Sequence, residues 1–250
     1  MITLTINGMK VEAEEGETIL KVAQRLGIKI PTLCYHPALE PYGACRLCTV
    51  EVVKNGRSRL VTSCNFPIRD EIEVYTDSEK VIKTRKLILE LLLARCSNVE
   101  VIRKLAKEYG IERSRFGEGD ETCILCGLCV RVCNEIIGAN AISFTNRGTE
   151  REVNPPFKID FGACIGCGAC AFVCPTGAIK VEDVMGTRRI ERFNVERPMV
   201  KCKVCGRYFA TAAQVEYLKA KVNPPQEVLE ICPECRRNFY ATEIIALRHI

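Results

Sequence analysis

Apolar and polar residues alternate at the very start of the chain. Ile2, Leu4 and Ile6 are separated by polar residues, which is the period of a half-buried strand. The pair Asn7-Gly8 then favours a hairpin turn, with residues 10–14 as the return strand. The pattern therefore predicts that the chain opens with a β-hairpin.

The rest of the first 78 residues alternates between helical and strand periods. Residues 17–26 have helical spacing and end at Gly27, a residue common at helix ends. Strands are expected at residues 49–53 and 71–74, with a hairpin turn at Asn55-Gly56. Two hairpins, one helix and a final strand predict a β-grasp arrangement, within a chain of the α+β class.

Residues 79–114 have a helical period and no chemistry of their own. Two apolar stripes, at residues 81–92 and 99–106, predict two helices, with Gly110 closing the second. We interpret this stretch as a packing connector whose lysines and arginines form a solvated face.

An internal repeat follows the connector. The spacing C-x2-C-x2-C-x3-C occurs twice, about 40 residues apart, and Asn154-Pro155-Pro156 marks a loop between the copies. Ala141-Ile142-Ser143-Phe144 in the first copy echoes Ala178-Ile179-Lys180-Val181 in the second. The repeat predicts a module over residues 115–190, followed by a separate tail over residues 197–250.

Cysteine changes the picture, because the chain has 17 of them among 250 residues. The first residues show no basic, apolar export signal, and no apolar run approaches the about 20 residues of a membrane span. We therefore expect a cytoplasmic, reducing location, where disulfides do not persist. Metal ligation is the better explanation of the cysteines.

The repeated motif is the strongest chemical signal. Three cysteines spaced by two residues share one tight loop and bind three irons of a 4Fe–4S cube, while the fourth cysteine binds the other cube. This crossing assigns two ligand sets: Cys123, Cys126, Cys129 and Cys174 for one cluster, and Cys164, Cys167, Cys170 and Cys133 for the other. Residues 115–184 thus resemble a two-cluster bacterial ferredoxin, which implies two 4Fe–4S clusters close enough for fast electron transfer.

The first domain has its own set of four cysteines, Cys34, Cys45, Cys48 and Cys64. Their spacing, C-x10-C-x2-C-x15-C, keeps the close pair of plant-type 2Fe–2S ferredoxins and lengthens the first gap. A zinc site made of two close pairs is less suitable, because Cys34 and Cys64 have no near neighbour. We predict one 2Fe–2S cluster here. His36 lies in the same loop, and we expect it to form a loop hydrogen bond, since a Rieske centre needs two histidines.

The residues around these cysteines carry a further resemblance. The segments Cys34-Tyr35-His36-Pro37 and Gly43-Ala44-Cys45-Arg46-Leu47-Cys48 are similar to the N-terminus of the large iron–sulfur subunit of complex I. They are equally similar to the matching subunits of NAD-linked hydrogenases and formate dehydrogenases. Many members carry one more 4Fe–4S cluster on a histidine and three cysteines. This chain has only Cys96 in that region, so we expect that cluster to be absent and Cys96 to be a buried thiol.

The tail contains a last set, Cys202, Cys205, Cys232 and Cys235, in the spacing C-x2-C-x26-C-x2-C. Two distant pairs of cysteines are typical of a structural zinc ribbon. Zinc is the first choice, then a single iron, then a further iron–sulfur cluster, and the spacing does not decide among them. The pattern at residues 212–221, between the two pairs, predicts a helix.

The resemblance implies an electron-transfer subunit of an oxidoreductase, with no substrate site of its own. The implied partners are a flavoprotein that binds NAD(P)H, a small 2Fe–2S subunit, and a hydrogenase catalytic subunit. We favour a hydrogenase, including the electron-bifurcating kind with ferredoxin as a further partner. A formate dehydrogenase or complex I-like enzyme is the alternative. Succinate dehydrogenase is excluded on cysteine spacing.

The formal charge of +5 has little weight for function. Each four-thiolate site carries roughly −2 once its metal is bound, so four sites bring the charge to about −3. We therefore expect no nucleic-acid partner, although a scaffold that uses clusters structurally is the competing class. That reading does not explain a motif that brings two redox centres together.

Overall fold

The computed structural model describes residues 1–239, and residues 240–250 of the predicted tail, with His249, lie outside the described part. The chain divides into two compact units. The first contains residues 1–132 and 173–178, and the second contains residues 133–172 and the chain from 179 onward. Among the described residues, no helix has both the length and the apolar character needed to cross a membrane.

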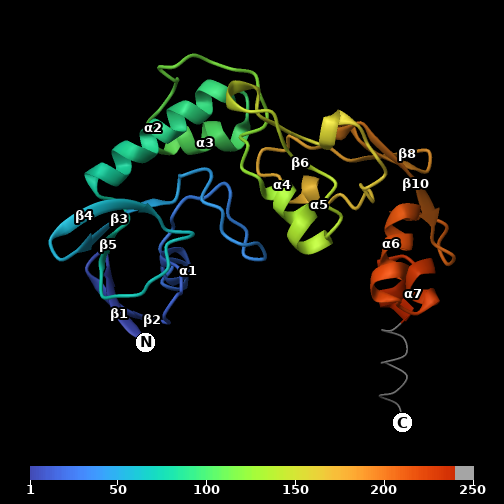
Figure 1. The fold of residues 1–250 in the computed structure, drawn as a ribbon, viewed down its shortest axis with the longest axis horizontal. Helices are drawn as coiled ribbons and strands as arrows, with labels where there is room; N and C mark the ends of the chain where they lie inside the picture. Colours follow the sequence, from blue (N-terminus) through green and yellow to red (C-terminus); the bar gives the residue numbers. More distant parts are fainter. Residues whose placement is uncertain (240–250) are drawn as a thin grey trace, which may run out of the picture. The chain divides into compact units, whose positions relative to one another are not determined.

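The first unit is built on a mixed five-stranded sheet in the order β2-β1-β5-β3-β4 (Figure 1). Strands β1 and β5 are parallel, and the other neighbours are antiparallel. This arrangement agrees with the β-grasp topology expected from the sequence. The strands are β1 (Ile2–Ile6), β2 (Met9–Ala13), β3 (Thr49–Lys54), β4 (Arg57–Thr62) and β5 (Glu73–Tyr75).

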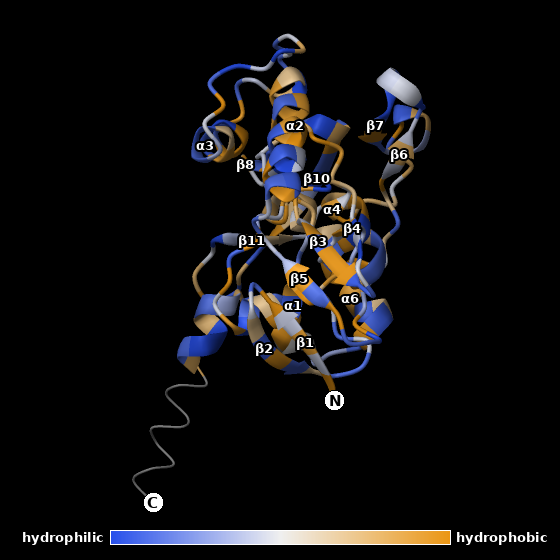
Figure 2. Cartoon of the chain, turned by 90° about the vertical axis from the view of Figure 1, so that its left-hand side faces the viewer, coloured by the Kyte–Doolittle hydropathy of each residue, from blue (hydrophilic) through white to orange (hydrophobic). Residues whose placement is uncertain are grey.

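One helix, α1 (Ile19–Arg25), covers this sheet. Thr18 caps the helix, because its side chain accepts a hydrogen bond from the backbone N–H of Lys21. Its apolar residues share a core with the inward residues of the sheet, so Leu20 and Val50 are both fully buried. Figure 2 shows hydrophobic residues, in orange, on the strands of the sheet near α1. The helix begins two residues later than the sequence pattern indicated, at the first residue after its cap.

Two helices form the connector, α2 (Glu79–Arg95) and α3 (Glu100–Glu108). They pack on each other and on Leu47 of the cysteine-rich loop, with Leu89 and Ile102 fully buried. Arg85 of α2 is also buried and donates to the carbonyl of Thr49, at 2.8 Å. The expectation of a packing connector is thus supported by its contacts, which fix α2 to the start of β3.

The second unit contains the part of the repeat from residue 133 to 172 and a four-stranded antiparallel sheet in the order β11-β10-β9-β8. A two-stranded β6–β7 hairpin lies in the chain between the two cysteine motifs. The sheet was not predicted from the sequence. Its strands are β8 (Glu182–Val184), β9 (Thr187–Ile190), β10 (Val195–Lys201) and β11 (Tyr208–Thr211), and the hairpin strands are β6 (Ser143–Thr145) and β7 (Glu152–Asn154).

Short helices carry the cysteine motifs, and two more follow the sheet. The motif helices are α4 (Leu128–Arg131), the π-helix η1 (Val132–Ile137) and α5 (Ala169–Phe172). The tail helices are α6 (Ala212–Val222), close to the predicted 212–221, and α7 (Gln226–Glu230). The remaining short helices are 3-10 turns, η2 (Gly148–Glu150), η3 (Pro156–Lys158) and η4 (Glu191–Phe193).

Candidate iron–sulfur and metal sites

The four cysteines of the first domain are gathered by the β3–β4 hairpin and the loop before it. Cys48 lies directly before β3 and Cys64 shortly after β4, and the pairing of Thr49 with Thr62 brings these two cysteines together. The backbone N–H of Cys45 donates to the sulfur of Cys34, at 3.4 Å. Three of the four, Cys34, Cys48 and Cys64, are about 1% exposed.

The thiols of this set lie close enough to share protons. The thiol of Cys45 hydrogen-bonds Cys34 and lowers the pKa of Cys34 to about 6, although burial opposes the change. The Cys64 thiol lowers the pKa of Cys48 to about 7 in the same way. The partner thiols, Cys45 and Cys64, have raised pKa values because they hold the shared proton. Sulfurs in such contact form a ready set of thiolate ligands.

A tight turn brings the backbone close to this set. Gly43 has a positive φ of +70°, and a Cβ at this position would lie 2.7 Å from the Asn65 side-chain nitrogen. Only glycine avoids both the strain and the collision. The glycine two residues before Cys45 is therefore needed for the loop to close around the four sulfurs.

Arg131 connects this loop with the first cysteine motif of the repeat. Its guanidinium donates to the carbonyl of Cys34, at 2.7 Å, and to the carbonyl of Glu40. It also lies over the ring of Tyr42, 5.6 Å from the centroid. Arg131 is two residues from Cys129, so one cation reaches the ligand loops of two predicted clusters within the first unit.

The set Cys123, Cys126, Cys129 and Cys174 belongs wholly to the first unit. The side chain of Arg95, at the end of α2, donates to the carbonyl of Cys123, at 2.8 Å. Burial raises the pKa of Cys126 to about 11, and nearby Cys174 and Cys123 add to this rise. The structure therefore brings Cys174, distant in the sequence, next to the motif of the first copy.

The set Cys133, Cys164, Cys167 and Cys170 belongs wholly to the second unit, where all four line one apolar cavity. Ile142, Ile190 and Phe193 line the same cavity, and all three are buried. Burial raises the pKa of Cys170 to about 12, with Cys167, Cys164 and Cys133 contributing. An apolar pocket lined by four thiols has the donor set of a cubane cluster.

The boundary between the units passes through both cysteine motifs. It separates Val132 from Cys133 and Phe172 from Val173, so the fourth cysteine of each motif belongs with the first three of the other. This is the partition expected when the fourth cysteine ligates the opposite cluster.

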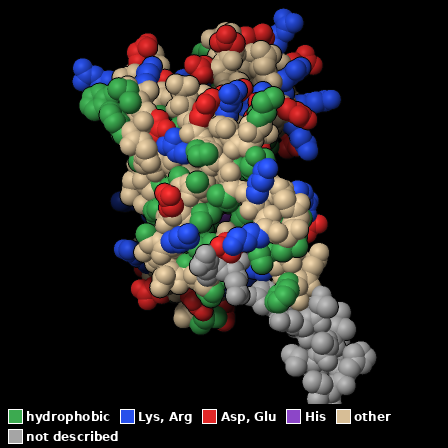
Figure 3. Space-filling view, turned by 90° about the vertical axis from the view of Figure 1, so that its right-hand side faces the viewer, with side chains coloured by type: hydrophobic (Ala, Val, Ile, Leu, Met, Phe, Trp, Pro, Cys, Tyr) green, Lys and Arg blue, Asp and Glu red, His purple; other side chains and the backbone are tan. Residues whose placement is uncertain are grey.

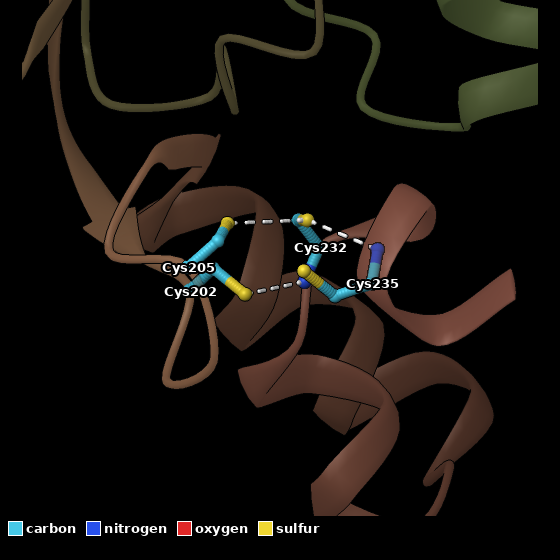
Figure 4. A group of neighbouring side chains, drawn as sticks. All are labelled: Cys202, Cys205, Cys232 and Cys235. Carbon is cyan, nitrogen blue, oxygen red and sulfur yellow. Dashed lines mark hydrogen bonds between the residues drawn. The ribbon is translucent and has the colours of Figure 1, made fainter. Parts of the chain in front are cut away.

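The tail cysteines form a compact group that could hold a metal (Figure 4). The four sulfurs of Cys202, Cys205, Cys232 and Cys235 all lie within 4.8 Å of one another. The sulfurs of Cys205 and Cys232 are 3.8 Å apart, and the N–H of Cys232 donates to the Cys202 sulfur, at 3.2 Å. Four thiolates are the donor set of a single zinc or iron, and also of a 4Fe–4S cluster.

Two residues singled out in the sequence have structural roles. Cys96 caps the C-terminus of α2 and is fully buried, which agrees with the prediction of a buried thiol, and burial raises its pKa to about 11. The ring of His36 accepts a hydrogen bond from the N–H of Ala38, at 3.2 Å, as expected of a loop residue.

Several residues that hold the ligand loops were not found from the sequence. Arg131, Arg188, Arg197 and Thr211 each donate a hydrogen bond to a backbone carbonyl of a cysteine-bearing loop. None follows the cysteine spacing, and an arginine or threonine at a strand or helix end has no distinguishing pattern. The run of basic residues at Arg188-Arg189 was the one available signal, and its first member lies at the second cysteine loop.

The folds, loops and thiol sets define an iron–sulfur protein with a 2Fe–2S domain and a two-cluster ferredoxin module. Two family models agree: a 2Fe-2S iron-sulfur cluster binding domain matches residues 1–79, and a 4Fe-4S dicluster domain matches residues 122–178. The chain is thus similar to an NADP-reducing hydrogenase subunit and to a 75 kDa subunit of NADH-ubiquinone oxidoreductase, which are iron–sulfur proteins of the same kind.

Individual relatives support this placement. The chain is 36% identical over 246 residues to the NADPH-Fe(3+) oxidoreductase subunit alpha of Geobacter sulfurreducens, covering 87% of this chain and 28% of the relative. It is 35% identical to the NADP-reducing hydrogenase subunit HndD of Solidesulfovibrio fructosivorans, covering 72% of this chain and 36% of the relative. The chain thus spans about a third of the length of these curated relatives.

A solved structure of an NAD+-reducing [NiFe]-hydrogenase in the H2-reduced state is also similar. The TM-score is 0.54 at 30% sequence identity, covering 62% of this chain and 74% of that chain. The resemblance to hydrogenase subunits stated from the N-terminal motifs is therefore confirmed.

Proposed function

We propose that the chain is the electron-relaying subunit of a multisubunit NAD(P)-linked hydrogenase. The observation that carries the proposal is that a 2Fe-2S domain model matches residues 1–79 and a 4Fe-4S dicluster model matches residues 122–178, two segments that contain twelve of the cysteines. When bound, iron–sulfur clusters supply one-electron chemistry over roughly −700 to +450 mV. That range includes the potentials at which nicotinamide nucleotides, ferredoxin and hydrogen exchange electrons.

The residues of each set have assigned roles in this proposal. Cys34, Cys45, Cys48 and Cys64 hold a 2Fe–2S cluster, and the two sets of the repeat hold one 4Fe–4S cluster each. The supporting contacts are the bond from the Cys45 N–H to the Cys34 sulfur, the proximity of Cys174 to Cys126, and the apolar pocket lined by the other set. The loop carbonyls are held by Arg95, Arg131 and Arg197.

For the tail we propose a single metal ion, with zinc as the first choice. Tetrahedral thiolates about 2.3 Å from one zinc have sulfurs roughly 3.8 Å apart. The observed 3.8 Å between Cys205 and Cys232, and the 4.8 Å limit for all four sulfurs, support this compact arrangement. A cubane spreads its thiolates farther, because each one lies outside its own iron. The zinc-ribbon interpretation of the tail is part of this proposal.

The domain boundaries and partners are proposals of the same kind. The functional modules are residues 1–78, 79–114, 115–190 and 197–250. Partners would be a flavoprotein that binds NAD(P)H, a small 2Fe–2S subunit and the hydrogenase catalytic subunit, with ferredoxin added in an electron-bifurcating complex. We propose a cytoplasmic location, which suits a chain with seventeen cysteines that we assign to metal ligation rather than to disulfides. On the face shown in Figure 3, basic and acidic side chains are interspersed, which favours protein partners over nucleic acid.

Purification of the native complex without oxygen, through a tag on this chain, tests the proposal. Nickel and flavin in the same particle would support a nickel–iron hydrogenase linked to nicotinamide. Molybdenum or tungsten would replace it with a formate dehydrogenase. A chain recovered without flavin or a further catalytic metal would contradict the subunit role and leave a free multi-cluster ferredoxin.

A further inference from the structure

The sheet and helix that lead into the tail contact the loops that carry the cysteines of the second 4Fe–4S set. Three successive carbonyls of the second cysteine loop, from Cys164 to Gly166, are each bound by a side chain of the sheet that leads into the tail. Arg197 of β10 donates to the carbonyl of Cys164, at 2.7 Å, and Thr211 of β11 donates to that of Ile165. Arg188 of β9 donates to the carbonyl of Gly166, at 3.2 Å.

The packing at this contact is equally close. Gly166 has a positive φ of +68°, and a Cβ there would lie 2.9 Å from a methyl carbon of Thr211 and 3.2 Å from the Arg197 side chain. Arg197 is itself held by Asp160, with 2.6 Å between a guanidinium nitrogen and a carboxylate oxygen. Both side chains are largely buried, at 14% and 17% exposure. The β10–β11 hairpin is thus the support on which the loop between Cys164 and Cys167 rests.

Helix α6 holds the other segment that carries a cysteine of this set. The hydroxyl of Tyr217 donates to the carbonyl of Ile137, at 2.6 Å, and the Lys221 amine donates to the same atom, at 3.1 Å. Ile137 ends the π-helix that contains Cys133, and the N–H of Gly138 donates to the Cys133 carbonyl, at 2.9 Å. The hairpin and α6 therefore support both segments that line the second cavity.

The tail cysteines add to the strand pairing of β10 with β9 and β11 in keeping these supports in place. No residue of α6 is fully buried, so apolar packing contributes little to its position. Cys202 directly follows β10, while Cys232 follows α7, on the far side of α6. A metal on these cysteines closes a loop that contains β11 and α6, which lowers the entropy gained when the hairpin or the helix detaches.

We propose that the tail metal site acts as a clamp on the second 4Fe–4S cluster, resting on the metal and cluster assignments proposed above. The bound metal keeps the β10–β11 hairpin and α6 against the segments that carry Cys133, Cys164, Cys167 and Cys170. Metal occupancy in the tail therefore controls how firmly the second cluster is retained. The first 4Fe–4S cluster and the 2Fe–2S cluster do not depend on it, because their cysteines belong to the other unit.

The test follows iron release from the full chain under anaerobic conditions, with a ferrous-iron chelator and absorbance as the readout. The double variant Cys202→Ser/Cys205→Ser removes two tail ligands. We expect about four of the roughly ten irons to leave at least about tenfold faster than in the wild type. The EPR spectrum that remains should match that of Cys164→Ala, which lacks a second-cluster ligand, and differ from that of Cys123→Ala.

Two further variants test the contacts while all four tail cysteines stay in place. Arg197→Lys removes the guanidinium Nε that donates to the Cys164 carbonyl, and Tyr217→Phe removes one of the two donors to the Ile137 carbonyl. Both should speed the release of the same four irons, with the tail metal retained. Arg189→Lys is the matched control, since Arg189 of the neighbouring strand β9 pairs with Glu196 of β10 and is half exposed. Its release rate should equal that of the wild type.

The outcomes distinguish a failure of the clamp from a failure of the tail-metal and cluster assignments on which it rests. A double variant that has lost the tail metal but releases iron at the wild-type rate would overturn the clamp and leave the electron-transfer role intact. A wild-type chain with about ten irons and no other metal would refute the tail assignment, and the clamp with it. Faster release of all clusters alike would mean general unfolding, which also contradicts a clamp specific to the second cluster.

Discussion

At the scale of single residues, cysteine spacing predicts the metal-binding groups but not the residues that hold their loops. Cysteine is reactive, rare and needed at fixed spacing, so a motif such as the one from Cys164 to Cys174 can be recognised from the sequence. Arg131 and Arg197 act through hydrogen bonds to the backbone carbonyls of the cysteine loops. Any long cation that reaches the loop could supply such a bond, so its place in the sequence is not fixed by a pattern.

Arg131 should tune the 2Fe–2S site, because its charge is held against the carbonyl of Cys34. A fixed cation stabilises the more negative, reduced state of a neighbouring cluster. Replacing it in Arg131→Met should lower the 2Fe–2S midpoint potential by on the order of 50 mV. An EPR-monitored redox titration measures this. Arg103→Met removes an equal charge from an exposed position on α3, and an equal shift in that control would refute a specific effect.

Glu51 predicts a pH-dependent contribution to stability. It is 8% exposed and accepts hydrogen bonds from Ser58 and, at 2.9 Å, from Lys80. These contacts, that of Ser58 first, lower its pKa to about 2 from an ordinary value of 4.5. Because the folded-state pKa is the lower one, the stabilisation is present above about pH 4.5 and is lost as the pH falls toward 2.

Glu51→Gln should therefore cost about 1–2 kcal/mol of unfolding free energy at pH 7. The difference from the wild type should narrow at pH 4, in anaerobic thermal unfolding of the full chain. Glu71→Gln, an exposed position in the same domain, is the control and should change little at either pH. A difference that stays constant between pH 7 and pH 4 would show that the Glu51 carboxylate has no such role.

At the scale of elements, the strands and helices with a clear apolar period were predicted, and those without such a period were missed. The alternation at Ile2–Ile6 and the turn at Asn7-Gly8 gave a correct first hairpin. The sheet of the second unit was missed because β8 is exposed at all three positions, so it shows no apolar alternation. Strand β10 contains Pro198, which ordinarily argues against a strand. These strands are stabilised by their hydrogen-bonded pairing with neighbouring strands and by their contacts with the second cysteine loop.

The loop that leads into Cys123 depends on close packing against the end of α2. A Cβ at Gly119 would lie 2.7 Å from the carbonyl oxygen of Ala94 and 2.8 Å from that of Arg95. Gly119→Ala must therefore displace the loop, and with it the bond from Arg95 to the Cys123 carbonyl. We expect faster iron release from the first 4Fe–4S cluster. Glu118→Ala, at the exposed neighbouring position, should release iron at the wild-type rate; equal rates for both variants would contradict the packing argument.

At the scale of the whole molecule, the two compact units follow the chemistry of the repeat. The sequence predicted one ferredoxin module, whereas the contacts divide it so that each unit holds one of the two sets of four cysteines from the repeat. One module and two units are compatible, because the fourth cysteine of each motif lies in the unit that holds the first three cysteines of the other motif. The support of the second cysteine loop by the tail could not be predicted, since it joins Thr211 to Ile165 across 46 residues without a shared pattern.

The central claim is that this chain carries three redox centres and one metal without a redox role. The most direct measurement is a stoichiometric reductive titration of the anaerobic full chain, with iron and zinc determined on the same sample. The account predicts about ten irons, about one zinc and three electrons per chain. About fourteen irons and four electrons would contradict it, because the tail cysteines would then hold a fourth electron-carrying cluster.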